Sequence, residues 1–169
     1  MSNNKEQFSR IYDQYINKIY RFVYLKVSSQ EIAEDITSKV FLKSWESYQK
    51  SRQPIQNINA FLYQVARNAV TDHYREDGRT KIISTDSTFE IADTRTNLHE
   101  KAMLTADMEV VKKAIQGLKK DYQDVLIWHY LEDMSTPLIA EILNKPAGTV
   151  RVMIHRGLQY LKDELRGEA

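Results

Sequence analysis

The sequence contains no cysteine, which excludes a disulfide framework and a metal site built from thiolates. Only 5 glycines and 3 prolines occur among its 169 residues, and this scarcity favours helices over a fold rich in loops. No apolar run approaches the roughly 20 residues that a helix needs to cross a bilayer. The N-terminal stretch MSNNKEQFSR also lacks the apolar segment of a signal peptide. We therefore expect a cytoplasmic protein.

A strong excess of either charge is also missing. The chain has 24 basic and 23 acidic residues, and its formal net charge is +1. A protein that binds a long DNA site alone is usually more basic. Any DNA contact is therefore expected to be local, or to be shared with a partner that neutralises much of the phosphate charge.

Motifs of enzymes and of metal centres are absent as well. The four histidines lie in separate predicted elements, and there is no HExxH, no GxSxG and no glycine-rich loop for phosphate. His129 lies among core-type residues and is expected to be a hydrogen-bonded structural residue rather than a ligand. We predict that the chain is not an enzyme and has no metal, no cofactor and no small-molecule substrate.

Helical periodicity is what the sequence does contain. Apolar residues recur every three or four positions over residues 5–27, about 30–48 and about 57–75. Ser29 is suited to cap the second of these helices. The stretch Gln49–Gln56 reads as a polar loop before the third. The N-terminal part is thus predicted to be a small helical domain.

The period is lost after the third helix and then returns. Asp77-Gly78 and many Ser, Thr and Asp residues predict an exposed linker, in which Ile82-Ile83 and 89–91 dock weakly. Helices are expected again at about 99–117, ending at Gly117, and at about 119–131. We predict an all-α fold with two small helical domains joined by a flexible linker: residues 1–76, linker 77–98 and residues 99–169.

The C-terminal end reads as a helix-turn-helix. Ser135 is placed to cap a short helix, and Pro146 cannot continue it, so that helix must end before Pro146. A longer helix begins near Gly148-Thr149. Gly157 lies inside this helix at a cost of about 1 kcal/mol relative to Ala, which indicates a packing partner close to its backbone. The second helix of such a motif is the one that enters a DNA major groove.

The outward side of that second helix is polar and basic. Three basic residues and no acid lie between Lys145 and Arg156. Helix N-terminal amides and arginines suit phosphate, and Arg also reads guanine edges. The alternative is an ordinary helical hairpin whose cations are a solvated face. The outward residues are Thr149, Arg151, Val152, His155, Arg156 and Gln159.

Two more polar stripes lie on the N-terminal helices. The stripe on the second helix is, by composition alone, more typical of a solvated face; it consists of Glu31, Asp35, Ser38, Lys39 and Leu42. The stripe on the third helix contains amides, a hydroxyl and arginines but no acid, with Tyr63, His73 and Tyr74 beside it. Such groups suit the edges and faces of unstacked single-stranded bases, although simple solvation is the alternative. This stripe consists of Gln64, Arg67, Asn68, Thr71 and Arg75.

Two blocks of sequence together resemble a known family. AEDITSKVFLKSW (33–45) followed by NAFLYQVARNAVTDHYR (59–75) resembles region 2 of sigma-70-type initiation factors, and 118–165 resembles their region 4. The short linker in place of a third domain is similar to the extracytoplasmic-function (ECF) group. ARN-x-x-x-DHYR and GTVR-x-x-x-HR, in this order and at this separation, make the resemblance specific.

The resemblance implies an RNA polymerase sigma factor that binds core RNA polymerase and directs promoter recognition and melting. It implies that the largest subunit's clamp helices bind Asp35, Ser38, Lys39 and Leu42. It implies that the −10 element meets loop 49–56 together with Tyr63, Gln64, Arg67, Asn68, Thr71 and Arg75. It implies that the −35 element meets Gly148, Thr149, Arg151, Val152, His155 and Arg156. The second-largest subunit's flap and an anti-sigma factor are further implied partners, and the linker would run towards the RNA exit channel.

Three sites depart from the family's pattern. Leu138 stands where a Glu is common before the pair Ile139-Ala140. Members often carry Gln-Glu or Gln-Asp where this chain has Ser38-Lys39, which reverses a charge at a polymerase contact. Val152-Met153 stands where a small polar and a basic residue are common, which trades a polar base contact for contact with a thymine methyl group.

Two other classes of protein remain as alternatives. A stand-alone helix-turn-helix regulator needs only the residues after 99 and has no use for the polar face of the third helix. A helical interaction protein with a helix-turn-helix that does not bind DNA is the second alternative.

Overall fold

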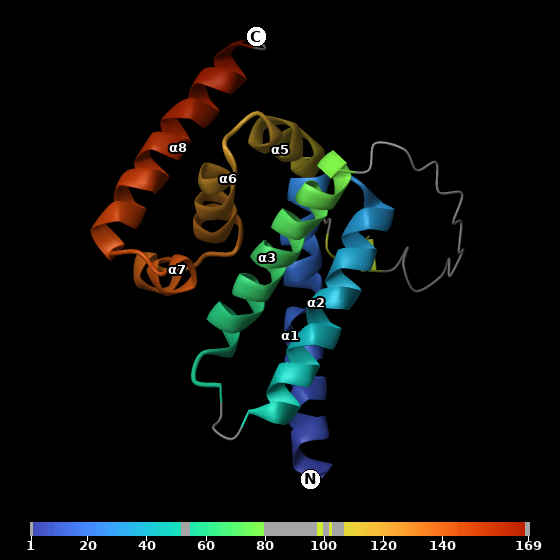
Figure 1. The fold of residues 1–169 in the computed structure, drawn as a ribbon. Helices are drawn as coiled ribbons and strands as arrows, with labels where there is room; N and C mark the ends of the chain where they lie inside the picture. The colour runs from blue at the N-terminus through green and yellow to red at the C-terminus, as the bar shows by residue number, and fades with distance from the viewer. Residues whose placement is uncertain (1, 52–54, 80–97, 100–101, 103–106, 168–169) are drawn as a thin grey trace. The chain divides into compact units, whose positions relative to one another are not determined.

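The computed structural model describes residues 2–51, 55–79, 98–99, 102 and 107–167, and within these ranges the regular structure is helical with no strand (Figure 1). This confirms the all-α prediction. Part of the predicted polar loop, residues 52–54, and residues 80–97 of the predicted linker lie outside the described residues. Ile82-Ile83 and residues 89–91, which were expected to dock weakly, also lie outside the described residues.

Contacts in space between residues divide the chain into two compact units. Unit 1 contains Met1–Gln56 and Val65–Leu104, and unit 2 contains Asn57–Gln64 and Thr105–Ala169. The start of the third helix thus groups with the C-terminal helices, and the domain boundaries inferred from the sequence remain a prediction.

Unit 1 is built on α1 (Ser2–Val27), α2 (Gln30–Lys50) and the part of α3 (Ile58–Arg79) that begins at Val65. Helices α1 and α2 pack side by side. The Ser29 hydroxyl accepts a hydrogen bond from the Ile32 amide at 3.3 Å, so the predicted cap of α2 is confirmed. The buried core residues of this unit include Ile19, Phe22, Val23, Leu25, Ala33, Val40, Ala66 and Val70.

Helix α3 extends one turn beyond the end expected from the sequence. It continues through Glu76, Asp77 and Gly78, where a turn and the start of the linker were expected. Among the described residues, no atom lies within 4 Å of a Cβ position at Gly78, so none of them packs against the end of α3 there. One glycine costs a helix only about 1 kcal/mol, which does not stop a helix that is already formed.

His99 and Ala102 also pack in unit 1, against α1. The Tyr20 hydroxyl lies 2.8 Å from His99 Nδ1, and Arg21 Nη1 donates to the Ala102 carbonyl at 3.2 Å. Burial, with a smaller contribution from Glu34, raises the pKa of Tyr20 well above its usual range, so this phenol stays protonated at neutral pH. A helix was predicted from about His99 to Gly117. The corresponding described helix, α5, begins at Asp107.

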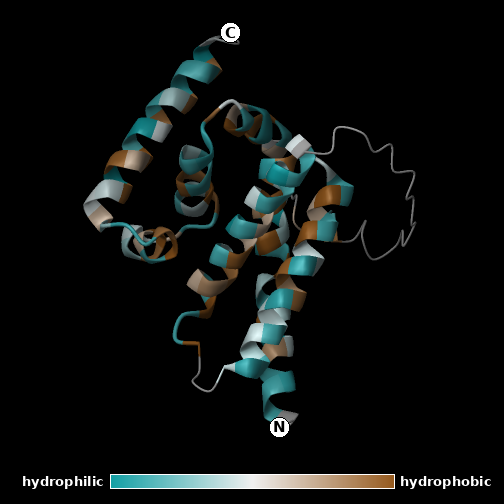
Figure 2. Ribbon diagram, in the orientation of Figure 1, coloured by the Kyte–Doolittle hydropathy of each residue, from teal (hydrophilic) through white to brown (hydrophobic). Residues whose placement is uncertain are grey.

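Unit 2 is an assembly of shorter helices around the long last one. It contains α5 (Asp107–Gln116), α6 (Lys120–Leu126), the π-helical turn η1 (Ile127–Leu131), α7 (Thr136–Leu143) and α8 (Ala147–Gly167). Helix α8 packs against α5, α6 and α7. Apolar and polar residues alternate along α8 (Figure 2), and its buried residues are Val150, Ile154 and Gly157. The buried core of this unit includes Ile115, Val125, Leu126, Trp128, Ile139, Val150 and Ile154.

The π-helical turn η1 was not expected, because the sequence predicted one helix through Leu131. The Glu132 amide donates to the Ile127 carbonyl at 3.0 Å, five residues back, so the last turn is wider than an α-helical turn. Ile127 and Trp128, the first two residues of η1, are both fully buried. His129 Nδ1 lies 3.3 Å from the Met134 carbonyl oxygen, so His129 is hydrogen-bonded, as predicted.

The N-cap of α7 offers a test of local stability. The Ser135 hydroxyl accepts a hydrogen bond from the Leu138 amide at 3.3 Å. We expect Ser135→Ala to lower the free energy of unfolding of unit 2 by about 1 kcal/mol, because the amide loses its acceptor. Chemical denaturation followed by circular dichroism measures this, with Ser135→Asp as a control that keeps an acceptor. An unchanged midpoint for Ser135→Ala would show that the cap does not stabilise the helix.

Candidate nucleic-acid interface

The turn between α7 and α8 is closed by backbone hydrogen bonds. Asn144 adopts the left-handed conformation (φ 55°, ψ 48°), and its amide bonds to the Ala140 and Glu141 carbonyls at the end of α7. Asparagine tolerates this conformation at a helix C-terminus better than most residues. The Pro146 carbonyl then accepts from the Val150 amide at 3.1 Å and opens α8. The predicted helix-turn-helix and its break before Pro146 are confirmed.

One side of α8 is buried against the other helices of unit 2, and the residues on its opposite side are exposed. Val150, Ile154 and Gly157 are buried. Consequently all six residues predicted to meet the −35 element are exposed: Gly148, Thr149, Arg151, Val152, His155 and Arg156.

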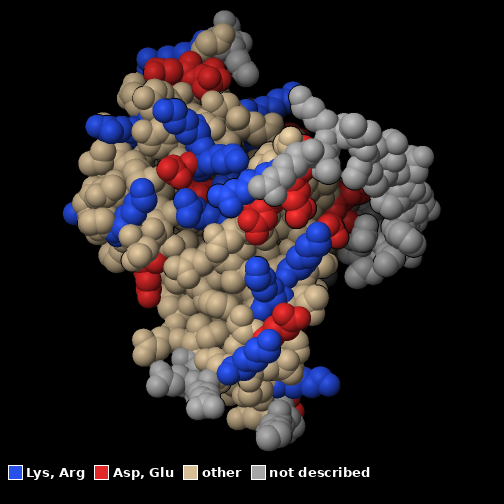
Figure 3. All heavy atoms as spheres, in the orientation of Figure 1, with Lys and Arg blue, Asp and Glu red and all other residues tan. Residues whose placement is uncertain are grey.

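Charge and space at the start of α8 both suit an anionic partner. No acidic residue occurs between Asn144 and Gln159. The positive end of the helix dipole adds to the charge of Arg151 and Arg156. Of the atoms in the described ranges, a Cβ at Gly148 would meet only Arg151 Nη2, at 3.8 Å, so these ranges leave the backbone open to a close approach. Elsewhere the surface in view carries interspersed basic and acidic side chains, in agreement with the near-zero net charge (Figure 3). The basic character of α8 is therefore local.

Four of the predicted −10 residues lie on the part of α3 that belongs to unit 1. Asn68 and Arg75 are exposed, and Arg67 and Thr71 are half-buried. The Thr71 hydroxyl donates to the Arg67 carbonyl at 2.9 Å within the same helix. Asn68 and Arg75 are thus the two most accessible polar groups of this set.

The other two predicted −10 residues, Tyr63 and Gln64, do not lie on an open face in this structure. Tyr63 is fully buried, and its ring lies edge-on to Trp128 with a centroid distance of 5.9 Å. Gln64 Nε2 donates to the carbonyls of Glu141 at 3.3 Å and Ile142 at 3.1 Å. In this structure Tyr63 is therefore a packing residue, and its role at the −10 element stays a prediction.

The predicted polymerase-binding face on α2 is exposed throughout. Asp35, Ser38, Lys39 and Leu42 all face solvent, and Leu42 is 61% exposed. Lys39 Nζ lies 3.2 Å from Asp35 Oδ2, so the reversed charge is partly balanced within the helix itself. Such an exposed ion pair contributes little stability, about 0–1 kcal/mol, and is easily replaced by pairs with a partner.

An aromatic groove beside Leu42 was missed by the sequence analysis. It encloses about 330 Å³ between α1 and α2, and its lining includes Phe8, Tyr12, Phe41 and Trp45. All four rings belong to the apolar periodicity of residues 5–27 and about 30–48, which is typical of buried positions, yet Tyr12 is 43% exposed. The position of Tyr12 at the edge of the apolar stripe of α1 was the only available signal.

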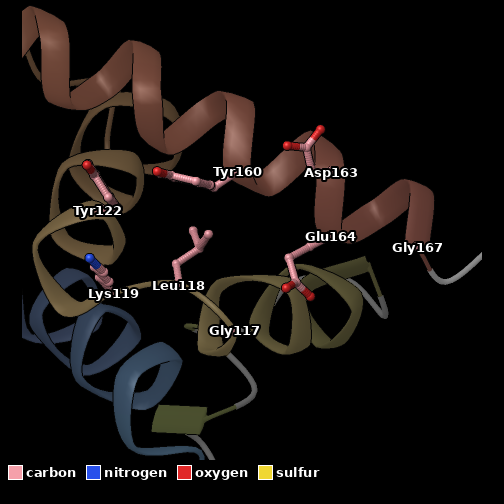
Figure 4. A pocket seen from close by; sticks show the side chains of 8 residues that line it. All are labelled: Gly117, Leu118, Lys119, Tyr122, Tyr160, Asp163, Glu164 and Gly167. Atoms are coloured by element: carbon pink, nitrogen blue, oxygen red, sulfur yellow. The ribbon is translucent and has the colours of Figure 1, made fainter.

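Unit 2 also contains a cavity of about 500 Å³, between the segment after α5 and the second half of α8 (Figure 4). The rings of Tyr122 and Tyr160 lie 5.4 Å apart on its wall. The Glu164 side chain points towards Gly117, where a Cβ would come within 3.2 Å of its Cδ. No pattern in the sequence predicted this cavity.

Two further observations concern metals and membranes. In the described ranges no group of three or more His, Asp or Glu side chains is placed to hold a metal ion. None of the described helices combines the length and apolar character that spanning a membrane requires.

Comparison with known proteins identifies a family for two parts of the chain. The family model for sigma-70 region 2 matches residues 11–80, and that for sigma-70 region 4 matches residues 108–161. The ECF RNA polymerase sigma factor BldN of Streptomyces coelicolor is 23% identical over 164 residues, which are 97% of this chain and 62% of BldN. The ECF RNA polymerase sigma factor SigW of Bacillus subtilis is 27% identical over 174 residues, covering 96% of this chain and 91% of SigW.

Two solved structures share the fold. The sigma factor RpoE of Bartonella quintana, in complex with the anti-sigma factor NepR, matches with a TM-score of 0.73 and 20% identity, over 95% of this chain and 98% of that chain. CnrH, in complex with the cytosolic domain of CnrY, matches with a TM-score of 0.67 and 18% identity, over 99% of this chain and 93% of that chain.

An all-helical protein with a region 2 unit, a region 4 unit and a helix-turn-helix is a transcription initiation factor of the sigma class. This chain belongs to the sigma-70 family, within its ECF group. Sigma factors act with core RNA polymerase on promoter DNA inside the cell, and they regulate transcription without being enzymes.

Proposed function

We propose that this sigma factor binds core RNA polymerase through the exposed face of α2, captures the −10 element with the outer face of α3, and reads the −35 element with α8. The observation that carries the proposal is the acid-free, fully exposed face at the start of α8. The chain performs no catalysis itself, and it acts in the cytoplasm together with its polymerase.

The proposed roles of α3 at the −10 element and of α8 at the −35 element rest on their exposed side chains. Asn68 and Arg75 offer an amide and a guanidinium for the edges and phosphates of unstacked bases. Extruding a base costs a few kcal/mol, which contacts from these side chains and from the polymerase offset. Arg151 and Arg156 suit the duplex −35 element, where guanine edges lie in the major groove. The near-zero net charge fits a factor whose polymerase supplies much of the phosphate contact.

The face of α2 is proposed to dock on the clamp-helix coiled coil of the largest subunit. Leu42 is the largest exposed apolar group there, and the aromatic groove beside it provides more apolar area. The balance between Asp35 and Lys39 allows Lys39 to pair with an acid on the polymerase instead.

Leu42→Arg tests this docking. Losing a buried leucine contact is worth roughly 1.5–3 kcal/mol, so we expect at least about a tenfold loss of affinity for core polymerase. The matched control is Val110→Arg, which places the same charge on a 58% exposed valine of α5 in unit 2. Fluorescence anisotropy of labelled protein titrated with core polymerase gives both affinities. Equal affinities for Leu42→Arg and the unmodified protein would contradict the proposed face.

Two additional partners are proposed. The cavity of Tyr122 and Tyr160 has apolar walls and a polar rim, as expected of a groove for an amphipathic segment, and we assign it to the flap of the second-largest subunit. An anti-sigma factor is the other partner, since RpoE and CnrH were both solved with a bound partner protein.

A further inference from the structure

Val152 is an exposed apolar residue at the middle of the polar face of α8. Its side chain is 48% exposed. Gly148, Val152, His155 and Gln159 follow one another at spacings of four, three and four, so they form a single row along the helix. All four are exposed, and Val152 lies in the second turn. The N-terminal residues of a recognition helix are those that contact base edges.

The chemistry of valine restricts what Val152 can contact. It has no hydrogen-bonding group, so it neither binds a phosphate nor reads a nitrogen or oxygen on a base edge. A single exposed apolar residue is ordinary on a protein surface. The major groove presents one apolar group, the C5-methyl of thymine, and this group suits an exposed valine in a row that has an arginine on either side.

We infer that Val152 is a specificity-determining residue that selects a base pair carrying thymine in the −35 element. This inference rests on the proposed function, in which α8 enters the major groove. Arg151 and Arg156 lie on either side of the row and suit guanine O6 and N7. The selected thymine is therefore expected next to guanine.

The test uses holoenzyme reconstituted from the full chain and core polymerase. First, a promoter library randomised across the −35 element is selected by binding, which gives the preferred sequence. Each selected thymine is then replaced by deoxyuracil, which removes only the methyl group. We expect one such replacement to weaken binding by roughly threefold to tenfold for the unmodified protein. Val152→Ser is expected to bind the thymine and deoxyuracil promoters equally.

Val110→Ser is the matched control, since it makes the same change at an exposed valine of α5, and it should retain the discrimination. Discrimination that persists in Val152→Ser would overturn the inference, as would the absence of any methyl effect in the unmodified protein. If the unmodified holoenzyme selects no −35 sequence at all, it is the proposed function that fails. The two failures are therefore distinguishable.

Discussion

Replacing Arg151 and Arg156 together by alanine is expected to lower −35-dependent transcription by roughly 10²-fold or more. Each arginine that contacts a guanine or a phosphate is worth about 1–3 kcal/mol of binding, and the two lie on the same exposed face. Neither side chain is buried, so the thermal midpoint of unfolding should stay unchanged. Run-off transcription with reconstituted holoenzyme measures the effect.

The control for lost charge is the double variant Lys113→Ala and Lys162→Ala. Both lysines are exposed in unit 2, on α5 and on the second half of α8, so the same charge is removed away from the proposed interface. A general electrostatic effect would weaken both double variants equally, and such a result would contradict a specific role for the arginines. Unimpaired transcription by the arginine variant would favour the alternative of a helix-turn-helix that does not bind DNA.

Enlarging Gly157 to leucine is expected to destabilise unit 2 by about 1–3 kcal/mol or more. A Cβ at this position would already lie 3.3 Å from Leu126 Cγ and from Tyr122 Cβ, where α8 crosses α6. Leucine restores about 1 kcal/mol of helix propensity, but it has no room beyond the Cβ. Alanine should be close to neutral, because its propensity gain offsets one tight contact.

The stability of this series is measured by denaturation followed by circular dichroism. Lys162→Leu is the matched control, since it adds the same side chain to an exposed position of α8. A Gly157→Leu protein as stable as Lys162→Leu would mean that α6 and α8 do not approach each other as closely as described.

Features encoded locally were predictable from the sequence. Ser29 and Ser135 cap helices because their hydroxyls reach an amide three residues ahead, and Pro146 ends a helix through its own ring. Gly157 shows that a glycine inside a strong helical pattern marks a close helix crossing. Val150 and Ile154 are buried on one side of α8. Because the helix is amphipathic, the residues on its opposite side could be predicted to be exposed.

Features that depend on distant residues were not predictable. The apolar pattern around Tyr63 predicts which side of α3 the residue lies on. It does not predict the contact with Trp128, which lies far along the chain. The turn η1 extends over a single turn, too short for periodicity to distinguish π from α geometry. The groove beside Leu42 arises because Tyr12 sits at the edge of the α1–α2 packing, and sequence alone does not fix that edge.

Transcription from a pool of promoter fragments by reconstituted holoenzyme tests whether this chain confers promoter specificity on core RNA polymerase. The protein is first pulled down with core RNA polymerase, and run-off products are then sequenced. The account predicts core binding and selective run-off from fragments that share one −35 and one −10 sequence. Binding of duplex DNA by the chain alone, without binding of core polymerase, would contradict the account and favour a stand-alone helix-turn-helix regulator.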